Sequence, residues 1–258
     1  MKFLVLKKNI LKYIFILLLI SVLLTINLFG QPSAVVYFGQ VPRLVPIYGV
    51  DTTEKQIAIT FDSAWGADKT LGILDLLKKY DAKATFFLVG FWVDKYPDMV
   101  KAIHEQGIEI GTHSNTHPDF VKLSFEQMKL ELTASIEKIE NITNTKVELF
   151  RAPYGSYNNT MLNLTDSLNL KTIQWTIDTL DWKGLSGGEM VSRVLDKLST
   201  GDIILCHNNS DNILEGLELI LNRLTAKGYK FVSVGDLIMK DNYYIDNLGI
   251  QRKNKNVQ

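Results

Sequence analysis

The sequence lacks the features that define several special classes of protein. It contains a single cysteine, Cys206, so a disulfide framework is excluded. It also lacks an internal repeat and a low-complexity segment, which excludes a collagen-like or largely disordered chain. Its 258 residues are 46% hydrophobic and 10% aromatic, which is enough material for one large core.

The chain also lacks a surplus of positive charge. Its 28 basic residues balance 28 acidic ones, and residues 1–30 contribute four lysines and no acid. The remainder therefore carries 24 basic and 28 acidic residues. Because binding to nucleic acid needs excess basic side chains on one face, we do not expect a nucleic-acid partner.

One long apolar run is present, at the N-terminus. It extends from Tyr13 to Gly30, comes after the four lysines, and at about 18 residues is near the lower limit for spanning a bilayer. The preceding positive charge predicts a cytoplasmic N-terminus and export of the rest of the chain. Residues 1–30 are therefore expected to be a signal-anchor in the cell membrane, in preference to a cleaved signal peptide with secretion to the cell wall.

Strand and helix patterns alternate after a lead-in at residues 31–56. The alternation predicts an α/β domain over residues 57–240, a distorted (β/α) barrel of about seven parallel strands. Residues 241–258, rich in Asn and Lys, are expected to be a frayed polar tail. The predicted strands are 57–61, 84–89, 108–111, 147–150, 172–175, 203–205 and 231–234. The predicted helices are 68–80, 97–106, 124–142, 157–168, 187–199 and 212–227.

Two helix starts can be predicted from capping residues. Ser124, followed three residues later by Gln127, indicates a capping box at the start of the longest helix. Asp68 is the expected N-cap of the helix over 68–80, which leaves Asp62 free for chemistry.

Ionisable residues come after most of the predicted strands. In parallel β/α folds the carboxyl ends of the strands meet at one rim, and active sites lie there. We therefore expect one site built from several strand ends. The residues in question are Asp62, His113, Arg151, Asp178, Asp181 and His207.

Each of these positions also has a simpler interpretation. His113 and His117 could bind one metal ion from a loop turn, because Pro118 disfavours a helix there, or they could be two surface histidines. Asp62 could be a general base or a helix cap. The turn after Arg151 could direct a backbone N–H at an oxyanion while the guanidinium holds a carboxylate, or be an ordinary β-turn with a surface salt bridge.

The last two strand ends carry an acid, an aromatic residue and a histidine. Trp182, next to Asp181, could contact a sugar or wall an acyl pocket, or belong to the core. His207 alone would be structural, but paired with Asp181 it would be a tuned general acid. By contrast, His104 is interpreted as a solvated helix residue and excluded from the site.

Together these residues resemble the polysaccharide deacetylases, the carbohydrate esterases with a NodB homology domain. The resemblance covers residues 57–234. The residues Asp62-Ser-Ala-Trp-Gly66 and Ile47-Tyr-Gly-Val-Asp51-Thr are most similar to the sporulation-associated PdaB-like branch. The five motifs are Thr-Phe-Asp62, His113-x-x-x-His117, Arg151-x-Pro153-Tyr154-Gly155, Asp178-x-x-Asp181-Trp182 and Leu205-x-His207.

The resemblance implies a role for each site residue. The reaction would be metal-assisted hydrolysis of a glycan N-acetyl group, with a divalent ion (zinc or cobalt) on His113 and His117. Asp62, held by Arg151, would take a proton from water, and His207, oriented by Asp181, would protonate the leaving amine. The Tyr154 backbone N–H would stabilise the oxyanion, and Trp182 and Leu205 would wall the acetyl pocket.

One position departs from the family pattern. Ser63 stands where the family usually has a second aspartate as the third metal ligand, and a neutral hydroxyl is a poor ligand. Asp68 is the nearby acid that could substitute. An active enzyme with weak or unusual metal use is favoured, because the other motifs are intact. The alternatives are an altered substrate or a degenerate domain that only binds glycan.

The expected partner is a cell-wall polysaccharide, chiefly peptidoglycan, with chitin oligomers also possible. The first rival interpretation is a non-catalytic glycan-binding wall protein, which would release no acetate. The second is a metal-dependent hydrolase of another acyl or amide bond, since a fold does not determine a substrate.

Overall fold

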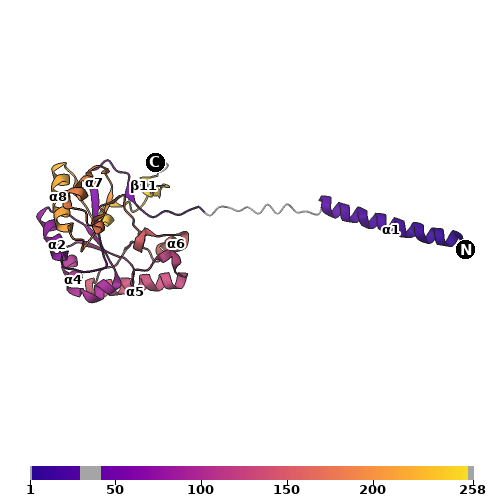
Figure 1. Cartoon of the computed structure of the whole chain (residues 1–258), viewed down its shortest axis with the longest axis horizontal. Coiled ribbons are helices and arrows are strands. Elements are labelled where there is room, and N and C mark those ends of the chain that lie inside the picture. Colours follow the sequence, from indigo (N-terminus) through magenta and orange to yellow (C-terminus); the bar gives the residue numbers. More distant parts are fainter. Residues whose placement is uncertain (1, 30–41, 255–258) are drawn as a thin grey trace. The chain divides into compact units, whose positions relative to one another are not determined.

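The protein, a computed structural model described over residues 2–29 and 42–254, divides into two compact units after Pro42. The first unit contains helix α1 (Lys2–Phe29; Figure 1). Its side chains are exposed over residues 9–25. Among the described residues no helix is both long and apolar enough to cross a membrane. The N-terminal apolar run lies within α1 up to Phe29. Residues 31–41 of the predicted lead-in lie outside the described residues.

The second unit is built on a sheet whose strands have the order β6-β5-β4-β3-β2-β8-β7, with β9 paired to β2. Every pairing in it is parallel, so the predicted α/β class is confirmed. The strands are β2 (Gln56–Ser63), β3 (Thr85–Leu88), β4 (Glu109–Thr112), β5 (Leu149–Phe150), β6 (Lys171–Thr172), β7 (Ile177–Asp178), β8 (Ile203–His207) and β9 (Lys230–Phe231).

The row of strands curls into a half-barrel, and the connection between its two end strands shows why. Strands β6 and β7 lie at opposite ends of the row, yet only residues 173–176 join them. Seven strands laid flat would separate those ends by about 29 Å, whereas five Cα steps reach at most about 18 Å. The sheet must therefore curve, and the carboxyl ends of its strands converge.

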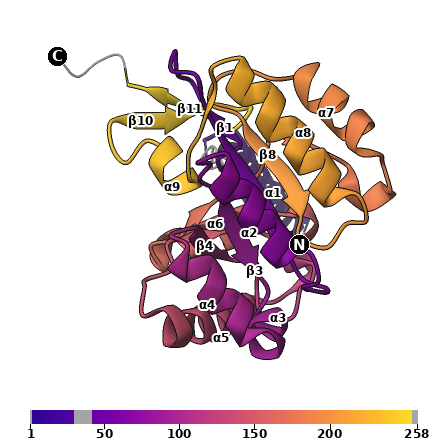
Figure 2. The ribbon, with the colours of Figure 1, turned by 90° about the vertical axis from the view of Figure 1, so that its left-hand side faces the viewer.

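Helices supply the crossovers between the parallel strands, as such pairing requires. Figure 2 shows them packed around the strands, with β10, β11 and α9 at one edge. The helices are α2 (Thr70–Lys79), α3 (Gly90–Lys95), α4 (Pro97–Glu105), α5 (Phe125–Thr143), α6 (Asn159–Ser167), α7 (Gly187–Leu195), α8 (Ile213–Ala226) and α9 (Val234–Leu237).

Alternation along the strands decides which residues reach the site. In β2, Ile57 and Ile59 belong to the larger apolar core, whereas Ala58 belongs to the smaller core on the other face of the sheet. Successive side chains of a strand point to opposite faces, so Asp62 shares the face of Ala58. The parallel register places Asp62 beside His207 of β8. The alternation along β2 and its register with β8 therefore place the Asp62 carboxylate beside the His207 imidazole.

The capping prediction for α5 is confirmed, and that for α2 is wrong. Ser124 accepts a hydrogen bond from Gln127 N, and the Gln127 side chain accepts one from Ser124 N, which completes the box. Helix α2 begins after Lys69 without a side-chain cap, and Asp68 is exposed outside it. The predicted strand over 231–234 is cut short because Ser233 caps α9.

The expected frayed tail is instead part of a second sheet, so this prediction is wrong. Strands β10 (Tyr243–Ile245) and β11 (Ile250–Lys253) pair with β1 (Gly49–Val50) in the order β1-β11-β10. Asp246 holds the connecting turn by accepting hydrogen bonds from two backbone N–H groups and from Arg252 Nε at 2.8 Å. Residues 255–258 lie outside the described part of the chain.

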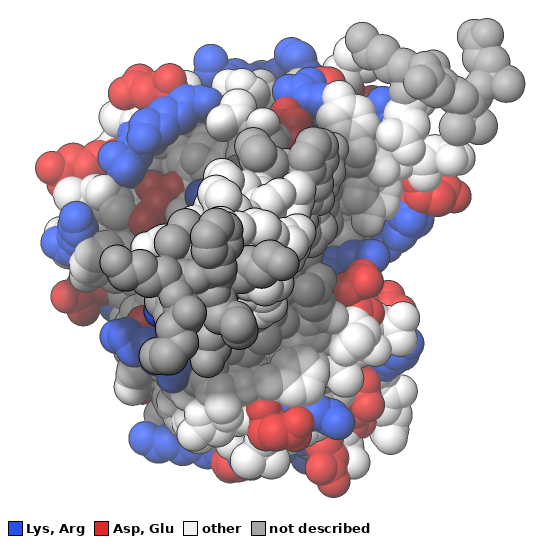
Figure 3. Space-filling view, turned by 90° about the vertical axis from the view of Figure 1, so that its right-hand side faces the viewer, with Lys and Arg blue, Asp and Glu red and all other residues white. Residues whose placement is uncertain are grey.

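The surface charge is mixed on the face that Figure 3 shows. Basic and acidic side chains of the described residues are interspersed there rather than grouped by sign. The described residues therefore group no charge of one sign on the part of that face that the view shows.

Candidate active site

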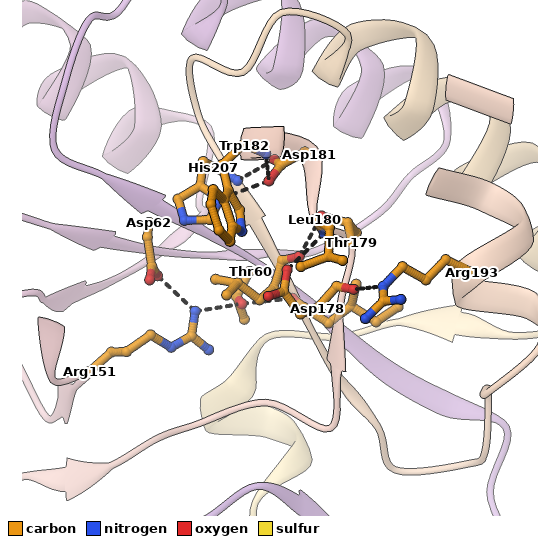
Figure 4. Close-up of polar contacts among 12 residues, drawn as sticks. Thr60, Asp62, Arg151, Asp178, Thr179, Leu180, Asp181, Trp182, Arg193 and His207 are labelled. Carbon is orange, nitrogen blue, oxygen red and sulfur yellow. Dashed lines mark hydrogen bonds and ion pairs between the residues drawn. The ribbon is translucent and has the colours of Figure 1, made fainter. Parts of the chain in front are cut away.

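Asp62 and Arg151 form a buried ion pair at the carboxyl ends of β2 and β5. Arg151 Nη1 lies 2.8 Å from Asp62 Oδ1 and donates a second 2.8 Å hydrogen bond to Thr60 Oγ1 (Figure 4). Its Nη2 donates to the Gln174 carbonyl at 3.1 Å. Arg151 is fully buried and Asp62 is 7% exposed, so water does little to screen their attraction. The guanidinium therefore fixes the carboxylate in place.

This environment keeps Asp62 ionised. Burial raises the pKa of Asp62, but the charge of Arg151, followed by the charges of His113 and His207, lowers it by more. The net shift of the pKa is downward. Asp62 is thus a carboxylate at neutral pH with its second oxygen, Oδ2, not bonded to Arg151, as a proton acceptor requires.

His113 and His117 lie together on the loop after β4. His113 is buried, its Nδ1 lies 2.8 Å from the Arg151 carbonyl oxygen, and its Nε2 lies 3.5 Å from Asp62 Oδ2. The two imidazole centroids are 4.9 Å apart. His117 has a left-handed backbone (φ 61°), and its N–H donates to Ser114 Oγ. The predicted loop turn, rather than a helix, brings the pair together.

The imidazole of His117 packs against three other rings. The rings of Trp65, His113 and Tyr154 meet it edge-on, with centroids 4.8–5.0 Å away. Its Nδ1 is buried without a hydrogen-bond partner among the described residues. Burial, followed by the charge of His113, lowers the pKa of His117 to about 4. Burial also lowers the pKa of His113, so both imidazoles are neutral at pH 7, the form that binds metal.

The donor set for a metal ion is incomplete. Within the described residues no group of three His, Cys, Asp or Glu side chains could hold an ion. Ser63 is fully buried, and its hydroxyl has no hydrogen-bond partner in the described part of the chain. Asp68 is exposed and does not line the cleft, so the structure does not bring it to the histidines. Two imidazoles are therefore present where catalytic zinc sites commonly have three protein ligands.

His207 and Asp181 form a second pair, at the ends of β8 and β7. Asp181 Oδ1 lies 2.8 Å from His207 Nδ1, and its Oδ2 accepts the His207 backbone N–H at 2.6 Å (Figure 4). Asp181 Oδ1 also accepts from Trp182 N at 2.8 Å. Burial lowers the pKa of His207, but the hydrogen bond and charge of Asp181 together raise it by more. This imidazole is thus held ready to carry a proton.

Asp178 shapes the turn that delivers Asp181. Its Oδ1 accepts a hydrogen bond from Leu180 N at 2.8 Å, and its carbonyl accepts one from Arg193 Nε at 2.6 Å. Leu180 has a left-handed backbone (φ 55°), which costs a side-chain-bearing residue about 1 kcal/mol. The hydrogen bonds around the turn offset that cost, so Asp178 acts as a scaffold for Asp181.

A cleft of about 730 Å³ joins these groups. Tyr154 has a left-handed backbone (φ 61°), and its N–H has no acceptor in the described part of the chain, whereas the next two N–H groups bond to the carbonyls of Ala152 and Pro153. Leu205 is buried in β8, and Trp182 is 57% exposed. The predicted site residues lining the cleft are Asp62, His113, His117, Tyr154, Asp178, Asp181, Trp182, Leu205 and His207.

Several residues of the site had no predicted role. Thr60 and Gln174 hold Arg151, and the ring of Phe87 lies 4.2 Å from its guanidinium carbon. Thr60 could have been found, since it lies two residues before Asp62 and so on the same face of β2. Trp65 and Trp175 line the cleft, and nothing in the local pattern distinguished them from core tryptophans.

Comparison with known proteins shows the family to which the chain belongs. The family model "Polysaccharide deacetylase" matches residues 49–173. A peptidoglycan-N-acetylglucosamine deacetylase of Bacillus cereus is 33% identical over 194 residues, which cover 73% of this chain and 91% of that protein. The chain belongs to the polysaccharide deacetylase family, as predicted. That relative is by name a hydrolase of amide bonds, which is the predicted class of enzyme.

Other similar proteins have no established activity or have lost it. The uncharacterized protein YlxY of Bacillus subtilis is 34% identical, and the match covers 75% of this chain but only 60% of YlxY. The solved structure of BA3943, described as a CE4 family pseudoenzyme from Bacillus anthracis, has a TM-score of 0.73 at 36% identity, covering 75% of this chain and 68% of that one. A mutant of BA3943 with restored enzymatic activity is equally similar in fold. The family thus contains both active and inactive sites.

Proposed function

We propose that this protein hydrolyses N-acetyl groups of peptidoglycan by general acid–base chemistry in the cleft. The observation that carries the proposal is the placement of two differently tuned groups at neighbouring strand ends. Asp62 is held as a carboxylate by Arg151, and His207 is kept basic by Asp181. Pairs of titratable groups whose environments separate their pKa values are typical of acid–base catalysis.

The residues can be assigned to the steps of amide hydrolysis. Asp62 removes a proton from a water molecule, and the water oxygen bonds to the acetyl carbon. The Tyr154 N–H donates a hydrogen bond to the oxygen of the resulting tetrahedral intermediate. His207 donates its proton to the sugar nitrogen, the C–N bond breaks, and acetate and a free amine leave. Arg151 and Asp181 touch the base and the acid rather than the substrate and are positioning residues.

A divalent ion is part of the proposal, although its protein ligands are incomplete. Members of this family are generally metal-dependent, and zinc or cobalt on His113 and His117 would supply Lewis-acid polarisation of the acetyl carbonyl. The two neutral imidazoles suit such an ion, but Ser63 offers a neutral hydroxyl in place of a carboxylate. Weak metal binding therefore belongs to the proposal, and none of the proton transfers assigned to Asp62 and His207 depends on the ion.

The proposed location is outside the cytoplasmic membrane. Two observations support it: the lysine-flanked apolar run at the N-terminus, and relatives named for peptidoglycan, an extracytoplasmic polymer. The N-terminal pattern favours anchoring in the membrane over secretion, and the PdaB-like resemblance favours a role in sporulation.

One measurement tests the proposal. Acetate released from peptidoglycan by the full-length protein is assayed with and without added zinc or cobalt, with Asp62→Asn as the blank. We expect metal-stimulated release from the wild type and at least about 100-fold less from Asp62→Asn. Absence of release from peptidoglycan and from chitin oligomers, at every metal concentration, would falsify the hydrolase proposal.

The second candidate function is glycan binding without catalysis. The observation that favours it is the missing third ligand at Ser63, together with the similarity to a pseudoenzyme. It predicts binding to peptidoglycan that Asp62→Asn leaves intact and no acetate from either protein. Turnover of simple esters without N-acetyl sugars would instead indicate a hydrolase of another acyl bond.

A further inference from the structure

Gln174 carries a buried polar side chain to which the proposed hydrolysis gives no role. It is 1% exposed and lies in residues 173–176, which join β6 to β7 across the open side of the half-barrel. The match to the family model ends at residue 173, just before it. Because a buried amide is costly without hydrogen bonds, its partners indicate what it supports.

The backbone and the side chain of Gln174 have different partners. Its N–H donates to the Ile47 carbonyl at 2.7 Å, and its carbonyl accepts from Arg151 Nη2 at 3.1 Å. Its side-chain Nε2 donates to the Gly155 carbonyl at 3.1 Å. One residue therefore contacts both the arginine that holds Asp62 and the turn that follows β5.

That turn has an unfavourable backbone conformation. Tyr154 (φ 61°) and Gly155 (φ 68°) are consecutive left-handed residues, a conformation that costs free energy for tyrosine. Within the turn, Gly155 N donates to the Ala152 carbonyl at 3.1 Å. Ser156 N donates to the Pro153 carbonyl at 3.3 Å. Both distances are at the long end of the range for hydrogen bonds, so support from outside the turn helps to keep its shape.

We propose that the Gln174 side chain holds this turn with the Tyr154 N–H facing the cleft, and so acts as a positioning residue for the oxyanion. Tyr154 lines the cleft, and its N–H has no acceptor in the described part of the chain. Such a donor is effective only when it is fixed before the reaction. The support of Arg151 and that of the oxyanion donor then meet in one residue. This inference rests on the proposed function for the reaction that uses the donor.

Gln174→Met tests the proposal in the full-length protein. Methionine has a similar length but no N–H, and the backbone carbonyl that accepts from Arg151 remains. We expect kcat for acetate release to fall about tenfold, less than the 10²- to 10³-fold loss typical of removing an oxyanion donor. KM is expected to stay within about twofold, because the oxyanion forms only as the reaction proceeds. The pH profile is expected to stay unchanged, because Asp62 and His207 keep their partners.

Gln251→Met is the matched control. Gln251 is also fully buried, its Nε2 donates to the Met239 carbonyl at 3.2 Å, and its Oε1 accepts from Met239 N. It belongs to β11 in the second sheet and does not line the cleft. This variant is expected to lose at least as much stability in urea as Gln174→Met, with kcat within about twofold of the wild type. An equal fall of kcat in the two variants would indicate general destabilisation and overturn the proposal.

Hydrogen exchange tests the same contact without turnover. The backbone N–H groups of Gly155 and Ser156 close the turn, and their exchange is followed by NMR in the wild type and in both variants. We expect exchange to become about fivefold faster in Gln174→Met, the effect of one lost hydrogen bond on local opening, and to be unchanged in Gln251→Met.

The outcomes separate this proposal from the proposed activity. Acetate release by the wild type, with an unchanged kcat or a raised KM alone in Gln174→Met, overturns the positioning role and leaves the hydrolase intact. No acetate release by the wild type overturns the hydrolase, and exchange then decides the structural role. Faster exchange in Gln174→Met supports the hold of Gln174 on the turn, and unchanged exchange overturns it.

Discussion

His207 and His117 occupy opposite sides of Asp62 and show opposite environments for the same side chain. His207 shares two hydrogen bonds with the buried carboxylate of Asp181, and its pKa is raised. His117 is enclosed by three rings, its Nδ1 has no partner within the described residues, and its pKa is lowered to about 4. The imidazole of His207 therefore binds a proton more readily than usual, whereas that of His117 stays neutral.

The difference shows that the two halves of the site are not equally complete. On the β7–β8 side, the acid, its orienting carboxylate and the surrounding backbone bonds are all in place. On the β4 side, the two neutral imidazoles have no third His, Cys, Asp or Glu ligand among the described residues, and Ser63 stands where the family usually has an aspartate. Carboxylate partners of metal-bound histidines usually orient the ring, and His117 has none among the described residues. Each half can therefore be tested separately.

Removing the partner of His207 is expected to have the largest effect. Asp181→Asn keeps the shape of a buried side chain but loses the charge that raises the pKa of His207. We expect kcat for acetate release to fall about 10²- to 10⁴-fold, the usual range for a general acid. Since a general acid must be protonated, the alkaline limb of the pH profile is expected to move to lower pH.

Asp178→Asn is the matched control for this change. Asp178 belongs to the same turn, and its Oδ1 accepts the Leu180 N–H, a bond that the amide oxygen of asparagine can keep. The charge of Asp178 also raises the pKa of His207, but less than Asp181 does, so the alkaline limb of Asp178→Asn is expected to move in the same direction by a smaller amount. An equal shift in the two variants, or an unshifted limb in Asp181→Asn, would contradict the assignment of His207 as the acid held by Asp181.

Completing the other half is expected to change metal affinity. Ser63→Asp places a carboxylate at the position where the family usually has one. We expect zinc affinity, measured by calorimetry, to rise about 10- to 100-fold, since an anionic ligand adds directly to the charge of the site. In chelator the variant is expected to be less stable than the wild type, because an unpaired buried carboxylate is costly.

Ser63→Asn provides the comparison for this variant. It has nearly the volume of aspartate without the charge, so it separates the effect of the ligand from that of packing in a fully buried position. Zinc affinity is expected to stay near that of the wild type. Equal affinities for Ser63→Asp and Ser63→Asn would show that position 63 does not reach the ion.

The contrast between the two halves also explains how much could be predicted from sequence. The strand ends could be located because buried strands appear as apolar runs, and a charged residue after such a run must lie at the rim. Asp62, Arg151 and His207 were found in this way. The neighbouring positions of Asp62 and His207 result from the parallel register of β2 and β8.

What could not be predicted depends on contacts between distant segments. Arg151 donates a hydrogen bond to the backbone carbonyl of Gln174, and a backbone contact of this kind leaves no signal in the sequence. The failure of Asp68 to reach the histidines depends on where α2 begins, and helix boundaries are poorly determined by local pattern. The strands β10 and β11 were missed because their polar composition concealed the strand pattern. Strand β10 pairs with β11, and β11 pairs with β1.

A smaller effect, on the free energy of unfolding, is expected at Thr60, which contacts Arg151. Thr60 donates to the Ile204 carbonyl at 2.7 Å and accepts from Arg151 Nη1. Thr60→Val leaves a buried guanidinium N–H unpaired, which costs about 1.5–3 kcal/mol of the free energy of unfolding in urea. Thr179→Val is the control, because Thr179 donates to the Leu205 carbonyl without contacting a charge. Its cost is expected to be about 1 kcal/mol, and equal costs would argue against the role of Thr60 in holding Arg151.

The smallest effects are expected in the pH dependence of stability, where the two histidines should act in opposite directions. His207 has a raised pKa, so its stabilisation is complete below the unfolded value of about 6.5 and is lost as pH rises through the folded value. His117 has a lowered pKa, so the stability that it contributes is present above about pH 6.5 and is lost as pH falls toward about 4. Urea unfolding in chelator at pH 5 and pH 8 measures both.

We expect His207→Gln to lose more stability, relative to the wild type, at pH 5 than at pH 8, because only at pH 5 does the wild type hold the full imidazolium–Asp181 pair. We expect His117→Gln to gain relative to the wild type at pH 5, because glutamine binds no proton and so escapes the cost of keeping a buried imidazole neutral. If both variants shifted in the same direction, the environments of the two histidines would not differ as the contacts indicate. Opposite shifts would show that the pKa of each imidazole is set by the hydrogen-bond partner of its ring nitrogen, which His207 has in Asp181 and the Nδ1 of His117 lacks among the described residues.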